Sequence, residues 1–93
     1  MKQFENNLDT AVFTTKFVII DKKDITYVTH DSDDGAWQFF SNDKSDNQEE
    51  VAMIVSLGEI INIDKTVLDI ADLPVGYIAF RQSIKDKWAI KKQ

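Results

Sequence analysis

The chain has 93 residues, a formal net charge of −5 and no cysteine. This length predicts a single domain over residues 1–93 with a small core, and the lack of cysteine excludes a disulfide framework and a thiolate metal site. The negative charge disfavours nucleic-acid binding, because contacts to phosphates need a basic surface. No apolar run approaches the roughly 20 residues of a membrane span, and the first residues do not resemble a signal peptide. We therefore expect a cytoplasmic protein that binds neither nucleic acid nor membranes.

The first half of the chain predicts three β-strands. Residues 1–10 predict a ragged start or a short helical turn. Residues 11–20 and 25–30 are rich in the β-branched and aromatic side chains that are typical of strands. Residues 36–40 follow a turn in which Gly35 can adopt a positive φ. We expect these three strands to pair in order as an antiparallel meander.

The middle of the chain predicts a loop, a strand and a helix. Residues 41–50 are polar and acidic, and they predict the most mobile loop of the protein. Residues 51–56 form a continuous apolar run, which favours a central strand buried on both faces. Ser56 and Glu59 have the spacing of a capping box, which predicts a short helix over residues 57–63.

The last third of the chain predicts a helical turn and two strands. Asp64 can cap the helical turn and Pro74 can stop it. Residues 75–83 and 85–92 then predict two strands joined by a turn. The order of strands, helical turns and strands indicates an α+β fold: a single small domain with a mostly antiparallel sheet and one or two short helices on one side.

Charge is distributed unevenly along the sequence. Residues 81–92 contain five basic residues against the single acid Asp86. Residues 31–50 contain one basic residue, Lys44, and seven acidic residues: Asp31, Asp33, Asp34, Asp43, Asp46, Glu49 and Glu50. This acidic segment can attract a basic partner, or it can be a solvated loop that keeps the protein in solution. The charges alone leave both interpretations open.

The only histidine, His30, precedes these aspartates. A zinc site usually needs three or four ligands, so one histidine without cysteine predicts none. A calcium loop that began at Asp31 would need its glycine one residue later, and a glutamate where Asn42 stands. His30 could form an acid–base pair with Asp33 or Asp34, but no nucleophile elbow or phosphate-binding glycine pattern accompanies it. We therefore predict no metal, no cofactor, no catalytic residue and no enzymatic activity.

Aromatic residues and the single arginine are the remaining candidates. Tyr27, Trp37 and Phe39 occupy alternate strand positions, which is typical of core packing. Phe40 belongs to the opposite face, where it is an interface anchor if exposed and a core residue if a helix covers it. Arg81 has a planar guanidinium that suits a carboxylate, so we expect an internal ion pair, with an interface contact as the alternative.

A series of short motifs spans roughly residues 15–90. They are Asp33-Asp34-Gly35 followed by Trp37 and Phe39, then Ile63-Asp64, Leu73-Pro74-x-Gly76 with Ala79 and Arg81, and finally Trp88. This pattern resembles a bacterial family of immunity proteins from polymorphic toxin systems, once catalogued as a domain of unknown function. The chain departs from it at Lys65, where the family pattern has a proline. The resemblance implies an α+β fold, no catalysis, and neutralisation of a toxin by direct binding.

Together the residues and the resemblance predict a non-catalytic domain that binds a cognate toxin with a basic surface. We expect the contact surface to combine the acidic residues with two aromatic anchors. Its predicted members are Asp31, Asp33, Asp34, Trp37, Phe40, Asp43, Asp46, Glu49 and Glu50. The alternative is a small ligand-binding or regulatory domain whose pocket is lined by His30, Asp33, Asp34 and Arg81.

Overall fold

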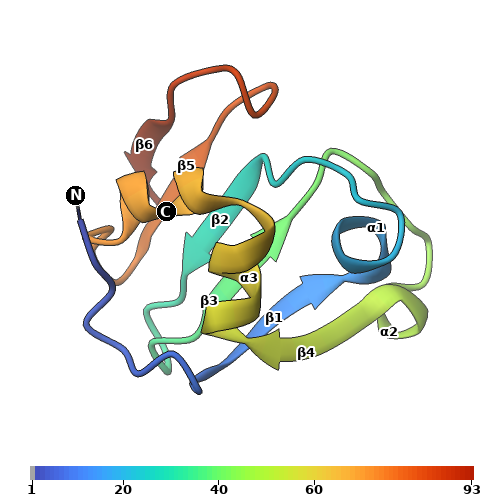
Figure 1. Ribbon diagram of the computed structural model, residues 1–93, viewed down its shortest axis with the longest axis horizontal. Helices are drawn as coiled ribbons and strands as arrows, with labels where there is room; N and C mark the ends of the chain where they lie inside the picture. Colours follow the sequence, from blue (N-terminus) through green and yellow to red (C-terminus); the bar gives the residue numbers. More distant parts are fainter. Residues whose placement is uncertain (1) are drawn as a thin grey trace.

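One six-stranded β-sheet organises the chain. A computed structural model describes residues 2–93 and places the strands in the order β4-β1-β3-β2-β5-β6 (Figure 1). The strands are β1 (Ala11–Thr15), β2 (Tyr27–His30), β3 (Trp37–Phe40), β4 (Ala52–Ser56), β5 (Tyr77–Phe80) and β6 (Ala89–Lys92). β1 and β3 are parallel, and every other neighbouring pair in this sheet is antiparallel. The predicted α+β fold with a mostly antiparallel sheet is confirmed.

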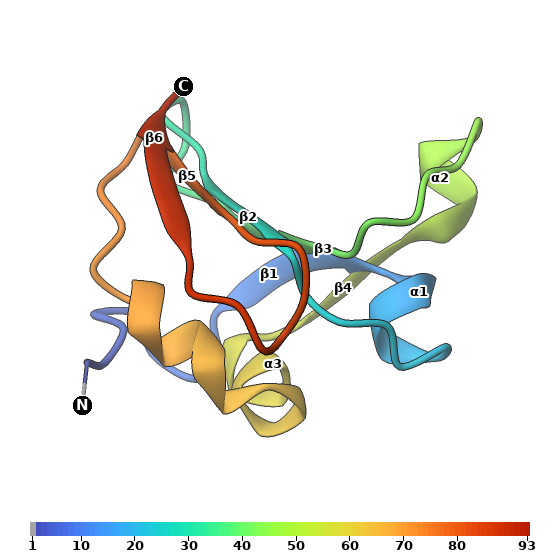
Figure 2. The same cartoon turned by 90° about the horizontal axis from the view of Figure 1, so that it is seen from above.

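Short helices accompany the sheet. Residues 2–93 contain α1 (Lys16–Ile19), α2 (Gln48–Val51), α3 (Leu57–Ile63) and the 3-10 helix η1 (Lys65–Ile70). Figure 2 shows α3 and η1 packed on one side of the sheet, while no helix lies over the opposite side of its central strands. None of the helices in the described residues has the length and apolar character that a membrane-spanning helix requires. We call the two sides the helix-covered face and the uncovered face.

Side chains of the central strands alternate between these faces. Val28 and Phe39 are in register on β2 and β3, and both are fully buried under the helices. The adjacent positions Tyr27, Phe40 and Phe80 are in register on the uncovered face. Tyr27 is 38% exposed and Phe80 is 37% exposed. The predicted core burial of Tyr27 is therefore wrong, because it pairs with Phe40 rather than with a core position.

The predicted strand over residues 11–20 is shorter than expected. β1 ends at Thr15 and α1 begins at the next residue. Thr15 pairs with Ala52, the first residue of β4, so β4 offers no partner beyond that point. The helical turn instead buries Val18 completely in the core. The prediction failed because an apolar run of this kind suits a strand or a buried helical turn equally well.

The predicted meander is only half present. β2 and β3 form the expected antiparallel hairpin, with Tyr27 opposite Phe40 and His30 opposite Trp37. β1, however, pairs with β3 in parallel and not with β2. Residues 16–26 form α1 and a connecting segment, rather than a tight hairpin turn, and this gives β1 the same direction as β3. The other edge of β2 pairs with β5.

The predicted central strand over residues 51–56 is an edge strand. β4 pairs with β1 alone, and Val51 belongs to α2. Ile54 is 65% exposed on the uncovered face, whereas Val55 is half-buried on the helix-covered face. A continuous apolar run predicts burial on both faces, but helices cover only one face here.

The helical segments of the second half begin where their capping residues predict. The Ser56 hydroxyl accepts a hydrogen bond from the backbone N–H of Glu59, 3.1 Å away, at the start of α3. The Asp64 carboxylate accepts one from the backbone N–H of Thr66, 2.9 Å away, at the start of η1. Both satisfy N–H groups that have no partner inside the helix. The predicted caps by Ser56 and Asp64 and the bounds of α3 are confirmed, but within residues 2–93 the Glu59 side chain forms no hydrogen bond back to Ser56, so only half of the capping box is present.

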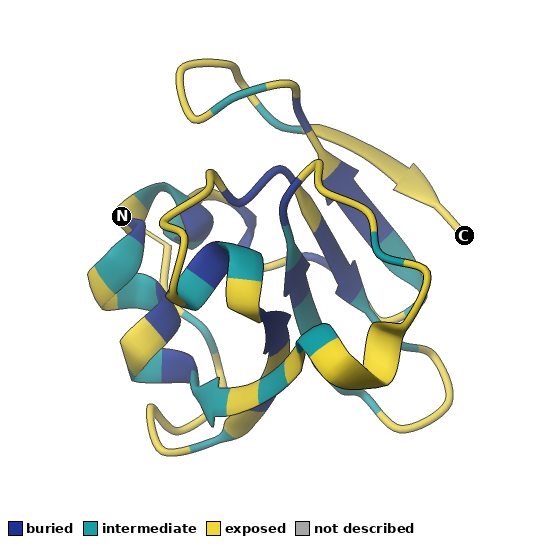
Figure 3. Ribbon diagram, turned by 90° about the vertical axis from the view of Figure 1, so that its right-hand side faces the viewer, coloured by how far each residue is buried: buried dark blue, intermediate teal, exposed yellow. Residues whose placement is uncertain are grey.

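The ends of the chain complete the fold. β5 and β6 are shorter than the predicted strands over residues 75–83 and 85–92, and β6 is exposed along its whole length (Figure 3). The predicted ragged segment over residues 1–10 includes Met1, which lies outside the described residues. Within it, the Phe4 ring packs edge-on against Trp37, with 4.9 Å between the ring centroids. The N-terminal segment thus contributes one aromatic contact to the core.

Candidate partner-binding surface

The fold divides the acidic segment of the sequence into two clusters. Three acids lie in the turn between β2 and β3: Asp31, Asp33 and Asp34, which we call the turn acids. Four acids follow β3, in the loop and in α2: Asp43, Asp46, Glu49 and Glu50, which we call the loop acids. β3 separates the clusters, and a strand of four residues spans about 10 Å. The acids that are close in sequence therefore form two sites at opposite ends of β3 (Figure 1).

Two of the turn acids stabilise their own turn. The Asp31 carboxylate accepts a hydrogen bond from the backbone N–H of Asp33, and the Asp34 carboxylate accepts one from that of Ala36, both at 2.9 Å. Gly35 has the expected positive φ of 73°. These local bonds fit the preference of aspartate for turns. Asp31 and Asp34 therefore support the β2–β3 hairpin.

The loop acids lie on the surface without a cationic partner. All four are exposed, and the expected loop contains the start of α2, which Asn47 caps by accepting hydrogen bonds from the backbone N–H groups of Glu49 and Glu50. Within residues 2–93 the ion pairs are Lys2–Asp72 and Arg81–Asp64, so neither involves a loop acid. Four uncompensated carboxylates in one short segment create a local negative potential.

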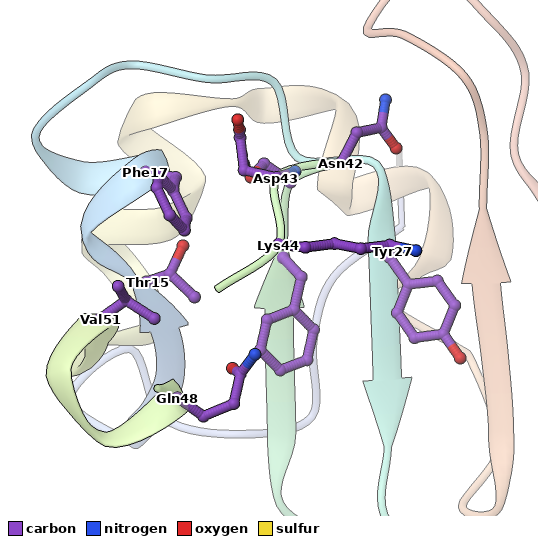
Figure 4. Close-up of a pocket in the computed structure, with 10 residues that line it drawn as sticks. Thr15, Phe17, Tyr27, Asn42, Asp43, Lys44, Gln48 and Val51 are labelled. Atoms are coloured by element: carbon purple, nitrogen blue, oxygen red, sulfur yellow. Dashed lines mark hydrogen bonds between the residues drawn. The ribbon is translucent and has the colours of Figure 1, made fainter. Parts of the chain in front are cut away.

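A shallow depression of about 370 Å³ lies between the loop and the uncovered face (Figure 4). Tyr27 and Phe40 from the sheet line it together with Phe17 of α1. Asp43 and Lys44 line it from the loop. The centroids of the Tyr27 and Phe40 rings lie 6.4 Å apart. Phe40 is half-buried, so the structure places it beside the acidic loop and not beneath α3 or η1.

Trp37 does not belong to this surface. Its side chain is 2% exposed, and its ring stacks on His30 with 3.9 Å between the centroids. Its indole N–H donates a hydrogen bond to the side-chain oxygen of Asn6, 3.2 Å away. The prediction that Trp37 anchors a partner needs correction, because the residue is enclosed by the core and by the N-terminal segment.

His30 has a structural position. Its Nδ1 lies 2.7 Å from the backbone carbonyl of Leu73, which accepts the hydrogen bond, and so links β2 to the segment before β5. Within residues 2–93 no hydrogen bond joins His30 to Asp33 or Asp34. A depression of about 280 Å³ lies beside His30, and Pro74 is among its lining residues, but neither aspartate lines it. The acid–base pair considered from the sequence is not formed.

Arg81 forms the expected internal ion pair. Its Nη2 donates to the Asp64 carboxylate at 2.7 Å, its Nη1 donates to the Thr66 hydroxyl at 2.9 Å, and Nε and Nη2 both donate to the carbonyl of Ile25. The guanidinium also lies over the Trp88 ring, 3.9 Å from its centroid. Hydrogen bonds and a carboxylate thus compensate this buried cation.

This position contradicts the alternative pocket. The backbone N–H of Arg81 bonds to the carbonyl of Thr26, just before β2, whereas His30 is the last residue of β2 and pairs with Tyr77. Arg81 and His30 therefore lie at opposite ends of β2, and they do not line one pocket with Asp33 and Asp34. Within residues 2–93 there is also no group of three acidic or histidine side chains that could hold a metal ion.

The uncovered face carries apolar residues that were not predicted to bind a partner. Phe13 and Ile54 are in register on β1 and β4, and Phe80 lies next to Tyr27 on β5. All of these side chains are exposed. Their signal was present in the sequence, since Phe13 and Phe80 alternate with core positions along their strands. This sequence signal was not decisive, because the alternation of side chains along a strand does not say which face of the sheet a helix covers.

The fold and the site define a small α+β domain that presents an open surface, with aromatic residues on one face of its sheet and uncompensated acids beside them. The chain belongs to the Imm33 immunity-protein family, because the family model described as Immunity protein Imm33 domain matches residues 12–91. Searches of curated proteins and of solved structures gave no match. Membership confirms the family resemblance seen in the sequence. It indicates a toxin-neutralising immunity role in which the domain binds a partner protein.

Proposed function

We propose that this chain neutralises a cognate toxin in the cytoplasm by binding it directly, without catalysis, through the loop acids. Family membership supports the immunity role. The observation that carries the choice of surface is the state of the four loop carboxylates, which are exposed and have no cationic partner within residues 2–93. Unpaired acids of this kind suit a toxin surface rich in lysine and arginine.

The expected effect of these charges is mainly kinetic. Complementary charges attract two proteins before contact and raise the association rate, and salt screens that attraction. The turn acids lie at the other end of β3, and within residues 2–93 they also have no ion pair. Two of the three turn acids accept hydrogen bonds in their own turn, whereas only one of the four loop acids, Asp43, accepts a side-chain hydrogen bond, from the Ser41 hydroxyl at 2.9 Å. We therefore assign the larger electrostatic contribution to the loop acids.

The arrangement around His30 supports a non-catalytic mode of action. The only histidine of the chain is engaged with the Leu73 carbonyl and the Trp37 ring. A general base must reach the proton that it abstracts, and the aspartates next to His30 in sequence do not orient its ring. Inhibition by occupation of the toxin surface needs no such group.

The direct test uses the polypeptide encoded by the gene adjacent to this one. Co-expression should protect cells from its toxicity, and surface plasmon resonance should show binding that weakens as salt rises. The double variant Asp46→Lys and Glu49→Lys should lower the association rate by about tenfold or more. The matched control, Asp9→Lys and Asp69→Lys, makes the same change in net charge at exposed acids elsewhere, and it should have a much smaller effect. Equal effects of the two variants, or no binding by the wild type, would contradict the proposal.

A further inference from the structure

Three aromatic residues form a continuous row across the uncovered face. Phe40, Tyr27 and Phe80 are directly opposite one another on β3, β2 and β5. Neighbouring strands lie about 4.8 Å apart, so these side chains are adjacent. Tyr27 and Phe80 are each more than one-third exposed, and Phe40 is half-buried. We call these three residues the aromatic row; it begins at the depression beside the loop acids and ends at β6.

Lysines of the chain itself lie at both ends of the aromatic row. At one end, the Lys91 ammonium group lies over the Phe80 ring, 5.5 Å from its centroid. At the other end, the Lys44 side chain extends across the depression that Tyr27 and Phe40 line (Figure 4). Neither lysine forms an ion pair within residues 2–93. An aromatic face attracts cations, so these lysines show the chemistry that the row accepts.

We propose, building on the proposed function, that the aromatic row is the centre of the toxin contact and receives lysine or arginine side chains of the toxin. Their aliphatic stems pack on the exposed rings and their charged groups point toward the loop acids at the border. Protein interfaces commonly have aromatic residues at their centre and polar or charged residues at their rim. The loop acids then govern the approach of the partner, and the aromatic row governs how long it stays bound.

Charge favours a basic partner over a second copy of this chain. Each copy carries a net charge of −5, so two copies repel one another at long range. The only arginine of the chain is buried in its ion pair with Asp64, so a second copy offers the row only lysines. A basic toxin surface has neither disadvantage.

The test measures association and dissociation rate constants for the wild type and for variants of the aromatic row. The binding partner is the polypeptide encoded by the adjacent gene. Tyr27→Ala and Phe80→Ala change side chains that are more than one-third exposed. Phe40 is left unchanged because it is half-buried, and its removal would also alter packing. Each of the two variants should raise the dissociation rate by about tenfold or more, while the salt dependence of the association rate stays unchanged. The matched control is Val75→Ala, an apolar side chain that is 51% exposed in the segment before β5 and should change binding less than about twofold. Circular dichroism and thermal unfolding verify that each variant is folded.

The outcomes separate this inference from the proposed function. If the wild type binds and both row variants dissociate at the wild-type rate, the aromatic row is not the contact centre, although the immunity role stands. If the wild type does not bind, the proposed function is wrong and the inference fails with it. If analytical ultracentrifugation shows a dimer of the wild type that Tyr27→Ala abolishes, the row is a self-association surface, and the assignment to a toxin is overturned.

Discussion

Both faces of the sheet carry aromatic and charged side chains, but these have partners within the chain on one face and are exposed on the other. On the helix-covered face, the guanidinium of Arg81 is matched by Asp64, and Trp37 is enclosed by neighbouring rings. On the uncovered face, Tyr27 and Phe80 remain exposed, and the loop acids beside them have no cationic partner in the described residues. Charged groups and aromatic side chains thus stabilise the fold where the chain itself supplies their partners. Where it leaves them uncompensated, they are available to a partner.

The largest effect should follow from removing the buried cation. Arg81→Ala leaves the Asp64 carboxylate buried without its partner, and should lower the free energy of unfolding by about 3–5 kcal/mol. Urea unfolding followed by tryptophan fluorescence measures this loss. Lys91→Ala is the control on the uncovered face, where the exposed cation should contribute less than about 0.5 kcal/mol. Similar losses in the two variants would contradict the distinction between the faces.

Replacing an aromatic residue on each face with alanine tests the distinction between the two faces without a change in charge. Trp37→Ala opens a cavity in the core and should cost about 3–5 kcal/mol of stability. Phe80→Ala removes a side chain that already contacts solvent, and should cost only about 1 kcal/mol. Both are measured by chemical denaturation of the purified variants. A cost for Phe80 as large as that for Trp37 would mean that the uncovered face is part of the stabilising core.

The β2–β3 turn sets the register that assigns each residue to its face. Gly35→Ala should lower stability by about 1–2 kcal/mol, because a left-handed backbone is unfavourable for a residue with a Cβ. A Cβ at this position would meet no atom within 4 Å, so the cost is one of backbone conformation and not of space. Gly35→Asn should cost less, since asparagine tolerates this conformation. Thermal unfolding of both variants checks the order.

The smallest effect on stability should come from the loop acids. Asp46→Lys combined with Glu49→Lys should change the free energy of unfolding by less than about 1 kcal/mol, because both side chains are exposed and unpaired. The same variant should lose most of its electrostatic attraction to a basic partner. A large loss of stability in thermal unfolding would show that these acids serve the fold and not binding.

Local features of this protein were predictable from neighbouring residues. The caps at Ser56 and Asp64 act over two or three residues, so the starts of α3 and η1 follow from the sequence. The β2–β3 hairpin follows from two strand-forming runs around a turn with Gly35. The internal pairing of Arg81 was expected from the chemistry of a lone guanidinium. Its particular carboxylate, 17 residues away in sequence, was not.

Features that depend on distant partners were not predictable. The parallel pairing of β1 with β3, the edge position of β4 and the exposure of Tyr27 all depend on which strands meet and which face the helices cover. The same limit affected the candidate site. Trp37 and Phe40 are three residues apart, yet one is buried beneath the helical layer and the other borders the acidic loop.

By itself, the sequence determined the fold class, the family, the principal turn and helix caps, and the presence of an acidic segment, because composition, spacing and hydrogen bonds between near neighbours encode these properties. Only the tertiary structure decided the strand order, the division of the acids into two clusters and the identity of the uncovered face. The physical reason is that alternation along a strand produces two possible faces. The burial of one of them depends on packing against α3 and η1, segments that lie far along the chain from β1, β2 and β3.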